Sequence, residues 1–437
     1  MDNDSIKSKI KELVKLYVTN KKSDATFIPG ETLIPPSGKV IDDAEVFNII
    51  DAGMDMWLTT GRFNEHFERK LANFLGVKKL ISVNSGSSAN LIAFNTLTSE
   101  KLGEKAIKKG DEVITVAAGF PTTINPSIQF GAIPVFVDID ISTHNIDANK
   151  IECQITERTK AIMIAHSLGN PFDLEKVVDL CKKYNLWLIE DCCDALGSKF
   201  NDQMVGTFGD ISTLSFYPAH HITMGEGGAV FSSNSQLMKI AESFRDWGRD
   251  CFCPPGKDNT CTKRFSWQLG DLPFGYDHKY TYSHMGYNLK ITDMQAACGL
   301  AQLDKLDNFI SSRKKNFKRV YDGLIGCEEF INLPVPTKNS DPSWFGFPIT
   351  LKDSAGIDRK TVIEFLNQNK IGTRLLFAGN VTKQPYMKNI TFRASDLKNT
   401  DYIMNNTFWI GIYPGLTDEM LDFTIHKLKQ ILGVGFD

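Results

Sequence analysis

The feature that most constrains the fold is an alternation, from about residue 75 to residue 235, between short apolar runs and stretches with helical spacing. The apolar runs are KKLISV, DEVITVA, IPVFVDI, KAIMIAHS, LWLIED, ISTLSF and GGAVFSS. Strands that alternate with helices form βαβ units, which build a mostly parallel sheet covered by helices. The pattern therefore predicts an α/β protein.

The regions that flank this alternation predict further parts of the chain. Residues 1–44 are expected to form an amphipathic helix and a loop ahead of a large domain, residues 45–324. Within that domain, residues 245–285 are rich in Pro, Gly and aromatic residues and predict a long functional loop. A helical stretch over residues 291–324 is expected to lead into a smaller α+β C-terminal domain, residues 325–437.

Composition narrows the functional classes. The chain of 437 residues is 42% hydrophobic and carries 49 Lys and Arg against 52 Asp and Glu, so its charge gives no electrostatic case for binding nucleic acid. No run of about 18 apolar residues predicts a membrane span, and the charged N-terminus does not resemble a signal peptide. We therefore expect a cytoplasmic protein, in which nine cysteines, an odd number, argue against a disulfide framework.

The segment LISVNSGSSANLIAF, residues 80–94, places small residues between a strand and a helix. Gly86 lets backbone N–H groups approach an anion at the helix N-terminus, where the helix dipole also favours negative charge. The hydroxyl groups of Ser87 and Ser88 offer further donors. The segment therefore favours a phosphate site, although a capped helix start has the same residues.

Two further segments carry polar side chains at strand ends. In LWLIEDCCDALGS, Asp191 ends an apolar strand, where ligands bind in open α/β sheets, and a carboxylate there can keep a pyridinium nitrogen protonated. In STLSFYPAHHITMGEGGAVFSS, a strand ends at Ser215 and leads to His220, His221 and a Gly-rich turn. Each residue alone has a structural explanation, and only the combination favours a cofactor site.

This combination resembles the DegT/DnrJ/EryC1/StrS family of vitamin B6-dependent sugar aminotransferases, over roughly residues 45–435. The resemblance implies fold type I, the aspartate aminotransferase-like fold, with a mostly parallel mixed sheet in the large domain, and a homodimer. It also implies bound pyridoxamine 5'-phosphate, held by a phosphate cradle, a stacking aromatic ring, a pyridine partner and an asparagine that reaches across the dimer interface. Gly86, Ser87 and Ser215 match the phosphate cradle, and Phe120 in AGFPTT matches the stacking ring. Asp191 matches the pyridine partner, and Asn288 in GYNLKITDMQAACGLAQL matches the asparagine.

One position departs from the family. The family pattern S-F-x-x-x-K carries the lysine that forms a Schiff base with the cofactor, and the matching residue here is His220. Imidazole cannot form that bond, but it can move protons near neutral pH. The string SFYPAHHIT resembles one branch of the family, the sugar 3-dehydrases, which implies that His220 is the base in removal of the C-3 hydroxyl group from a 4-keto-6-deoxyhexose.

The cysteine positions distinguish between members of that branch with and without a metal centre. Cys193, Cys251, Cys253 and Cys261 have the spacing C-x57-C-x-C-x7-C. Four thiolates suit a 2Fe–2S cluster, and the spacing resembles that of the members that act on CDP-4-keto-6-deoxy-D-glucose in 3,6-dideoxyhexose formation. Zinc binding and free thiols are the alternatives. Cys192 competes as the fourth ligand, and only the resemblance favours Cys193.

The resemblance also implies the partners. An iron–sulfur member takes a CDP-4-keto-6-deoxyhexose as substrate and receives electrons from an NADH-dependent flavin and iron–sulfur reductase, in the formation of O-antigen sugars of lipopolysaccharide. Members without a metal centre act on GDP-sugars with glutamate as the amino donor, and nucleotide-sugar aminotransferases lack redox chemistry. A scaffold protein that has lost catalysis is the remaining class, against which the cradle residues, Phe120 and Asp191 argue.

Overall fold

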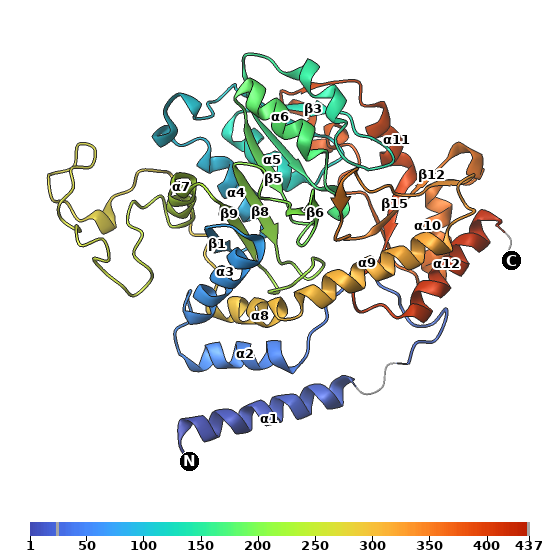
Figure 1. Ribbon diagram of the computed structural model, residues 1–437, viewed down its shortest axis with the longest axis horizontal. Coiled ribbons are helices and arrows are strands. Elements are labelled where there is room, and N and C mark those ends of the chain that lie inside the picture. The colour runs from blue at the N-terminus through green and yellow to red at the C-terminus, as the bar shows by residue number, and fades with distance from the viewer. Residues whose placement is uncertain (23–25, 435–437) are drawn as a thin grey trace.

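The chain folds around one large sheet with helices packed on it, and a second, smaller sheet lies in the C-terminal part (Figure 1). The structure is a computed structural model that describes residues 1–22 and 26–434. Residues 23–25, within the predicted N-terminal segment, and residues 435–437, within the predicted C-terminal domain, lie outside the described residues. No helix in the described part of the chain is long and apolar enough to cross a bilayer.

The large sheet has eight strands in the order β1-β9-β8-β5-β4-β2-β3-β14. They are β1 (Lys79–Val83), β2 (Glu112–Val116), β3 (Ile133–Val137), β4 (Thr159–Ala165), β5 (Trp187–Asp191), β8 (Ile211–Ser215), β9 (Gly228–Ser232) and β14 (Arg393–Ala394). Strands β8, β5, β4, β2, β3 and β14 pair in parallel, whereas β9 pairs antiparallel with β1 and β8. Seven of the strands coincide with the seven apolar runs, so the predicted mostly parallel mixed sheet is confirmed.

Both faces of this sheet are buried, which is why its strands are apolar throughout instead of alternating. In β9, Val230 packs on one face and Phe231 on the other. The first face is covered by α4 (Gly86–Thr96) and α7 (Ser235–Arg245), and the second by α3 (Arg62–Leu75), α6 (Leu174–Tyr184) and α8 (Asp293–Leu303). Helices α1 (Asn3–Lys22) and α2 (Asp43–Met54) precede these, and α2 packs on α8.

The second sheet has four antiparallel strands in the order β10-β12-β15-β13. Its elements are β10 (Ile331–Asn332), β12 (Phe347–Leu351), β13 (Thr373–Leu375) and β15 (Thr407–Ile410), with α9 (Leu306–Gly323), α10 (Arg359–Gln368), α11 (Lys398–Asn406) and α12 (Asp418–Leu432). Its core also takes in Phe317 from α9 and Ile34 from the N-terminal segment. This is an α+β arrangement, as predicted, while the domain boundary at residue 325 stays a prediction.

The helical stretch predicted over residues 291–324 consists of two helices. α8 ends at Leu303 and α9 begins at Leu306. The break coincides with an ion-pair cluster, because Lys305 Nζ lies 2.7 Å from Asp42 Oδ2 and 2.6 Å from Oε1 of the buried Glu45, both at the start of α2. The ends of two helices are thus held against a third.

Between α7 and α8 the chain runs from residue 246 to residue 292 as a loop that extends away from the body beside α7 (Figure 1). Its longest regular element in the described structure is the short 3-10 helix η5 (His278–Tyr280). Isolated bridges join Asp246 to Asn288 and Arg249 to Tyr282, so the loop leaves and re-enters the body at neighbouring points. A further three-stranded sheet consists of β11 (Ser340–Asp341), β6 (Lys199–Phe200) and β7 (Gln203–Met204).

Strand β14, which the sequence does not predict, brings the C-terminal part back to the large sheet. It pairs with β3, and Arg393 Nη2 lies 2.9 Å from Oε2 of Glu112, a residue without exposed surface at the start of β2. Burial alone would raise the pKa of Glu112, but hydrogen bonds from Arg393 and Thr156 outweigh burial and lower it. The ion pair therefore stabilises the outer edge of the sheet.

Replacing Arg393 by leucine is expected to lower the free energy of unfolding at pH 7 by about 1–3 kcal/mol, because a buried carboxylate loses a charged hydrogen-bond partner. The control is Arg319→Leu, which removes exposed ion pairs between α9 and α12 and should cost less than about 1 kcal/mol. Denaturant unfolding measures both.

The pH dependence of this effect has a definite sign. Folding lowers the pKa of Glu112, so its stabilisation is present above the unfolded value of 4.5 and is lost as the pH falls through the folded pKa. The difference between wild type and Arg393→Leu should shrink over that range. A difference that stays constant below pH 4.5 would contradict this assignment of Glu112.

Candidate active site

The first predicted site residues lie where β1 ends and α4 begins. Ser85 caps the helix, because its hydroxyl oxygen accepts a hydrogen bond from the backbone N–H of Ser88 at 3.1 Å. The Ser88 hydroxyl donates to Asn84 at 2.6 Å and is used within the chain, whereas Ser87 is exposed. With Gly86 as its first residue, α4 presents first-turn N–H groups and the Ser87 hydroxyl to an anion.

Sheet register brings Ser215 to this helix start. Val83, the last residue of β1, pairs with Gly228 of β9, and Gly228 pairs in turn with Ser215 at the end of β8. A Cβ atom at Gly86 would lie 2.5 Å from Cβ and 2.7 Å from Oγ of Ser215. Only glycine leaves this approach open, so the three residues of the predicted cradle lie together. Their contact with a phosphate group stays a prediction.

Asp191 ends β5 and is 4% exposed. Its Oδ2 accepts hydrogen bonds from Asn90 Nδ2 at 2.8 Å and Thr123 Oγ1 at 2.7 Å, and its Oδ1 accepts one from the backbone N–H of Cys193 at 3.0 Å. Carboxylate oxygens accept more than one hydrogen bond each, so these donors fix the orientation of Asp191 and leave acceptor capacity for a ring N–H. The sequence motifs predict no role for Asn90 or Thr123.

Phe120 lies at the start of α5 (Pro121–Phe130), beside the residues that hold Asp191. Its carbonyl oxygen accepts a hydrogen bond from the N–H of Thr123 at 3.1 Å, and its ring is 53% exposed. A large aromatic ring left outside the core at this point is available for stacking on a planar ligand. The stacking itself stays a prediction.

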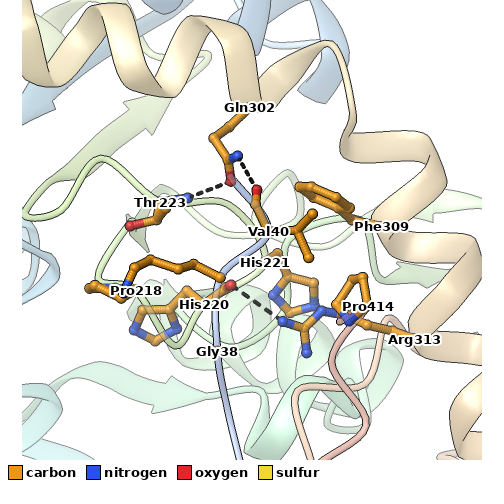
Figure 2. A pocket seen from close by; sticks show the side chains of 11 residues that line it. Gly38, Val40, Pro218, His220, His221, Thr223, Gln302, Phe309, Arg313 and Pro414 are labelled. Carbon is orange, nitrogen blue, oxygen red and sulfur yellow. Dashed lines mark hydrogen bonds between the residues drawn. The ribbon is translucent and has the colours of Figure 1, made fainter. Parts of the chain in front are cut away.

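His220 lies in the turn that follows β8 (Figure 2). Its backbone N–H donates to Tyr217 at 2.9 Å, and its carbonyl oxygen accepts a hydrogen bond from Nη2 of Arg313 at 3.3 Å. The imidazole Nδ1 lies 3.4 Å from Oδ1 of Asp194, and the ring centre lies 5.2 Å from that of Phe345. The turn thus places a partly buried imidazole next to a carboxylate.

The neighbouring His221 has a different environment. It is 3% exposed, and its Nε2 lies 2.8 Å from the carbonyl oxygen of Ser343. Burial and the nearby Arg313 hold the pKa of His221 well below its ordinary value. His221 is therefore a neutral donor that ties the turn to the segment before β12.

Asn288 lies apart from the cradle side chains but close to them along the backbone. It is exposed, and its amide oxygen accepts a hydrogen bond from Lys290 at 2.9 Å. The next residue, Leu289, accepts a hydrogen bond from the N–H of Asn84 at 2.9 Å, directly before α4. The reach of Asn288 across a dimer interface stays a prediction.

Three of the predicted cluster ligands lie together in the long loop. Cys251, Cys253 and Cys261 line one small pocket, together with His278 and other polar residues. Burial raises the pKa of the Cys251 thiol. At Cys253 burial is outweighed by hydrogen bonds, chiefly from Thr260, which lower the pKa of its thiol. The loop therefore concentrates three thiols in a setting that suits a metal ligand set.

Cys193 is not in this pocket. Its Sγ would lie 3.2 Å from a Cβ atom at Gly86, which places it at the cradle. Cys192 is 1% exposed and lies with His166 and Glu190, whose ligand atoms are all within 4.8 Å of one another. The structure thus brings together three of the four predicted ligands and does not assemble the complete set.

Comparisons with known proteins agree with this geometry. The model of the DegT/DnrJ/EryC1/StrS aminotransferase family matches residues 40–429. Lipopolysaccharide biosynthesis protein RfbH of Salmonella typhimurium is 61% identical over 437 residues, which cover both chains completely. The dTDP-4-dehydro-2,6-dideoxy-D-glucose 3-dehydratase of Saccharopolyspora spinosa is 49% identical over 427 residues, 98% of this chain and 92% of the relative.

Among solved structures, GDP-4-keto-6-deoxy-D-mannose-3-dehydratase of E. coli with bound hydrated PLP superposes with a TM-score of 0.81. It is 30% identical, and the match covers 91% of this chain and 99% of that one. The predicted fold type I architecture of vitamin B6-dependent enzymes is therefore confirmed.

Replacing Gly86 by alanine is expected to weaken binding of pyridoxamine 5'-phosphate at least tenfold, because the added Cβ displaces Ser215 from the helix start. Gly53→Ala is the matched control, since Gly53 lies in α2 and a Cβ there has no atom within 4 Å. Cofactor titration followed by protein fluorescence measures both affinities. Equal affinities for the two variants would contradict the cradle.

Proposed function

Because the chain belongs to the DegT/DnrJ/EryC1/StrS aminotransferase family, we propose that it is a vitamin B6-dependent sugar 3-dehydrase. It would remove the C-3 hydroxyl group of a nucleotide-linked 4-keto-6-deoxyhexose during deoxysugar formation. The observation that carries the proposal is His220, which stands at the position of the family's lysine while the cradle residues and Asp191 are retained. A family member that has lost that lysine but kept the cofactor site needs a different proton carrier.

The residues present fit pyridoxamine 5'-phosphate. The absence of a side chain at Gly86 leaves space beside Ser215 for a phosphate group, and the first turn of α4 supplies N–H donors. Asp191, oriented by Asn90 and Thr123, would accept a hydrogen bond from the protonated ring nitrogen. When bound, the cofactor supplies an amine that condenses with the sugar ketone and a ring that takes up electrons.

The chain's own contribution to the chemistry centres on His220. An imidazole exchanges protons readily near neutral pH, so His220 would accept a proton from the cofactor's methylene carbon as the C-3 hydroxyl leaves. Asp191 would keep the ring nitrogen protonated, which favours that proton transfer. Because imidazole cannot bind the cofactor covalently as lysine does, ordinary transamination through a lysine adduct is not available to this chain.

The finer part of the proposal concerns the substrate and the redox partner. We propose that the substrate is a CDP-4-keto-6-deoxyhexose and that the enzyme is a homodimer. We also propose that four thiolates hold a 2Fe–2S cluster, those of Cys193, Cys251, Cys253 and Cys261. An NADH-dependent flavin and iron–sulfur reductase would supply this cluster with electrons. The cysteine spacing and the three thiols gathered in one pocket support the cluster. Cys193 does not line that pocket.

That separation of Cys193 favours a second candidate function. A 3-dehydrase that acts on a GDP-sugar and takes its amino group from glutamate needs the cradle, Asp191 and Phe120 but no metal ligands. The E. coli relative carries the name of a GDP-sugar 3-dehydratase. The two candidates differ in whether the purified protein contains iron and whether its turnover depends on glutamate.

Replacing His220 by asparagine is expected to lower the rate of dehydration by about 10²-fold or more, while cofactor binding is kept, because asparagine cannot accept the proton. His66→Asn, on the exposed face of α3, is the control. Substrate consumption is measured alongside cofactor content. Normal turnover by His220→Asn would rule out the assignment of the base.

Protein purified without oxygen is expected to contain about two iron and two sulfide ions per chain and to show an electron paramagnetic resonance signal after reduction. Cys193→Ala and Cys253→Ala should lose both, whereas Cys192→Ala should keep them. Iron-free wild-type protein whose turnover requires glutamate would replace the cluster proposal by the second candidate function. If Cys192→Ala lost its iron and Cys193→Ala kept it, Cys192 would be the fourth ligand in place of Cys193.

A further inference from the structure

A carboxylate, that of Asp194, lies next to the Nδ1 atom of the His220 imidazole. Nδ1 lies 3.4 Å from Oδ1 of Asp194, and the two side chains are 15% and 13% exposed. Within the described structure Nδ1 has no hydrogen-bond partner, although it is shielded from solvent. The separation is longer than the roughly 2.7–3.2 Å of an N–H···O hydrogen bond, and such contacts in ligand-free active sites commonly tighten when the ligand binds.

Asp194 itself is not engaged in another ion pair among the described residues. It follows β5 by three positions, in the same segment that carries Asp191. Arg313, a buried cation that is 1% exposed, interacts electrostatically with Asp194. Burial lowers the pKa of Arg313 to about 10, and the charge of Asp194 acts against that fall. The carboxylate is therefore directed at His220 without being neutralised by a direct salt bridge.

The backbone and one face of His220 are held by other groups. Nη2 of Arg313 donates to the carbonyl oxygen of His220 at 3.3 Å, while Nη1 donates to the carbonyl oxygens of Trp344 at 3.3 Å and Phe345 at 3.1 Å. The Phe345 ring is tilted by 39° against the imidazole. Figure 2 shows the guanidinium group directed at the His220 carbonyl oxygen. These contacts fix where the ring is attached, but not which nitrogen carries the proton.

Two other titratable groups at the turn, His221 and Arg313, do not compete for Nδ1. His221 is directed to the carbonyl oxygen of Ser343, and its lowered pKa keeps it neutral. The guanidinium of Arg313 binds backbone carbonyl oxygens. Asp194 is thus the group in a position to select between the two tautomers of His220.

We infer that Asp194 is a positioning residue for His220. By accepting a hydrogen bond from Nδ1–H, it places the lone pair on Nε2, which takes up the proton when the C–H bond of the cofactor methylene breaks and its electron pair passes into the cofactor. The same carboxylate then stabilises the imidazolium that results. This inference rests on the proposed function, because it assigns Asp194 a task only if His220 is the base.

A double-mutant cycle tests the catalytic part. Asp194→Asn keeps the shape of the side chain but removes the charge, and it should lower kcat by about 10²-fold or more with little change in KM. In the His220→Asn background the same substitution should have no further effect, because Asp194 acts only through His220. Asp202→Asn, in the exposed turn between β6 and β7, is the control and should leave kcat unchanged.

Additive losses in the double variant, or an increased KM with unchanged kcat, would overturn the inference and assign Asp194 to general structure or substrate binding. Iron and cofactor content measured on each variant serve as checks, because Asp194 adjoins Cys193. Loss of bound cofactor in Asp194→Asn would equally overturn it.

A spectroscopic arm does not depend on turnover. In holoenzyme with ¹⁵N-labelled histidine, the His220 signals, assigned by their absence in His220→Asn, should report Nδ1–H in wild type and a mixture of tautomers in Asp194→Asn. Unchanged signals with normal wild-type dehydration would overturn the inference and leave the proposed function in place. A third outcome is that Asp194→Asn changes the tautomer of His220 as expected while the wild-type enzyme does not dehydrate the sugar. That outcome would support the pairing of Asp194 with His220 and refute the proposed function.

Discussion

The structure depends on the burial of both faces of a mostly parallel sheet. Helices cover the two faces, so polar side chains from several strands can converge only at the strand ends. Strands β5 and β8 end at Asp191 and Ser215, and the register through Gly228 sets the end of β1 beside them. The predicted anion site, the Asp191 carboxylate and the turn that carries His220 therefore lie at one edge of the sheet as a consequence of topology.

The same constraint explains how much the sequence predicts. Seven strands were predictable because two-sided burial requires unbroken apolar runs, whereas β14 has two residues, Arg393 and Ala394, and carries no pattern. The cradle and Asp191 were predictable from local motifs. Asn90 and Thr123 donate hydrogen bonds to Asp191 across 101 and 68 residues of sequence. Both residues lie inside or next to segments that the motifs cover, but a local pattern does not specify a partner so far away in the sequence.

Replacing lysine by histidine changes what the turn after β8 must achieve. A lysine has a single amine on a flexible chain, so reach is its main requirement. An imidazole is planar and has two inequivalent nitrogens, so its orientation and tautomer both matter. The contacts of His220 restrict both its orientation and its tautomer. Arg313 donates a hydrogen bond to its carbonyl oxygen, Phe345 packs beside its ring and Asp194 lies next to its Nδ1. The sequence contained all of these residues, but their convergence depends on α9 and the segment before β12.

The cysteines show why ligand type and spacing do not by themselves make a metal site. The loop thiols lie together, and hydrogen bonds already lower the pKa of Cys253. At Cys193, burial raises the pKa of the thiol well above its ordinary value, and Asp191 adds to the rise. A thiol must lose its proton to bind a metal, so burial and the charge of Asp191 both oppose metal binding at Cys193. A four-thiolate site that includes Cys193 would therefore depend on the positive charge of the metal to offset this rise in the pKa of its thiol.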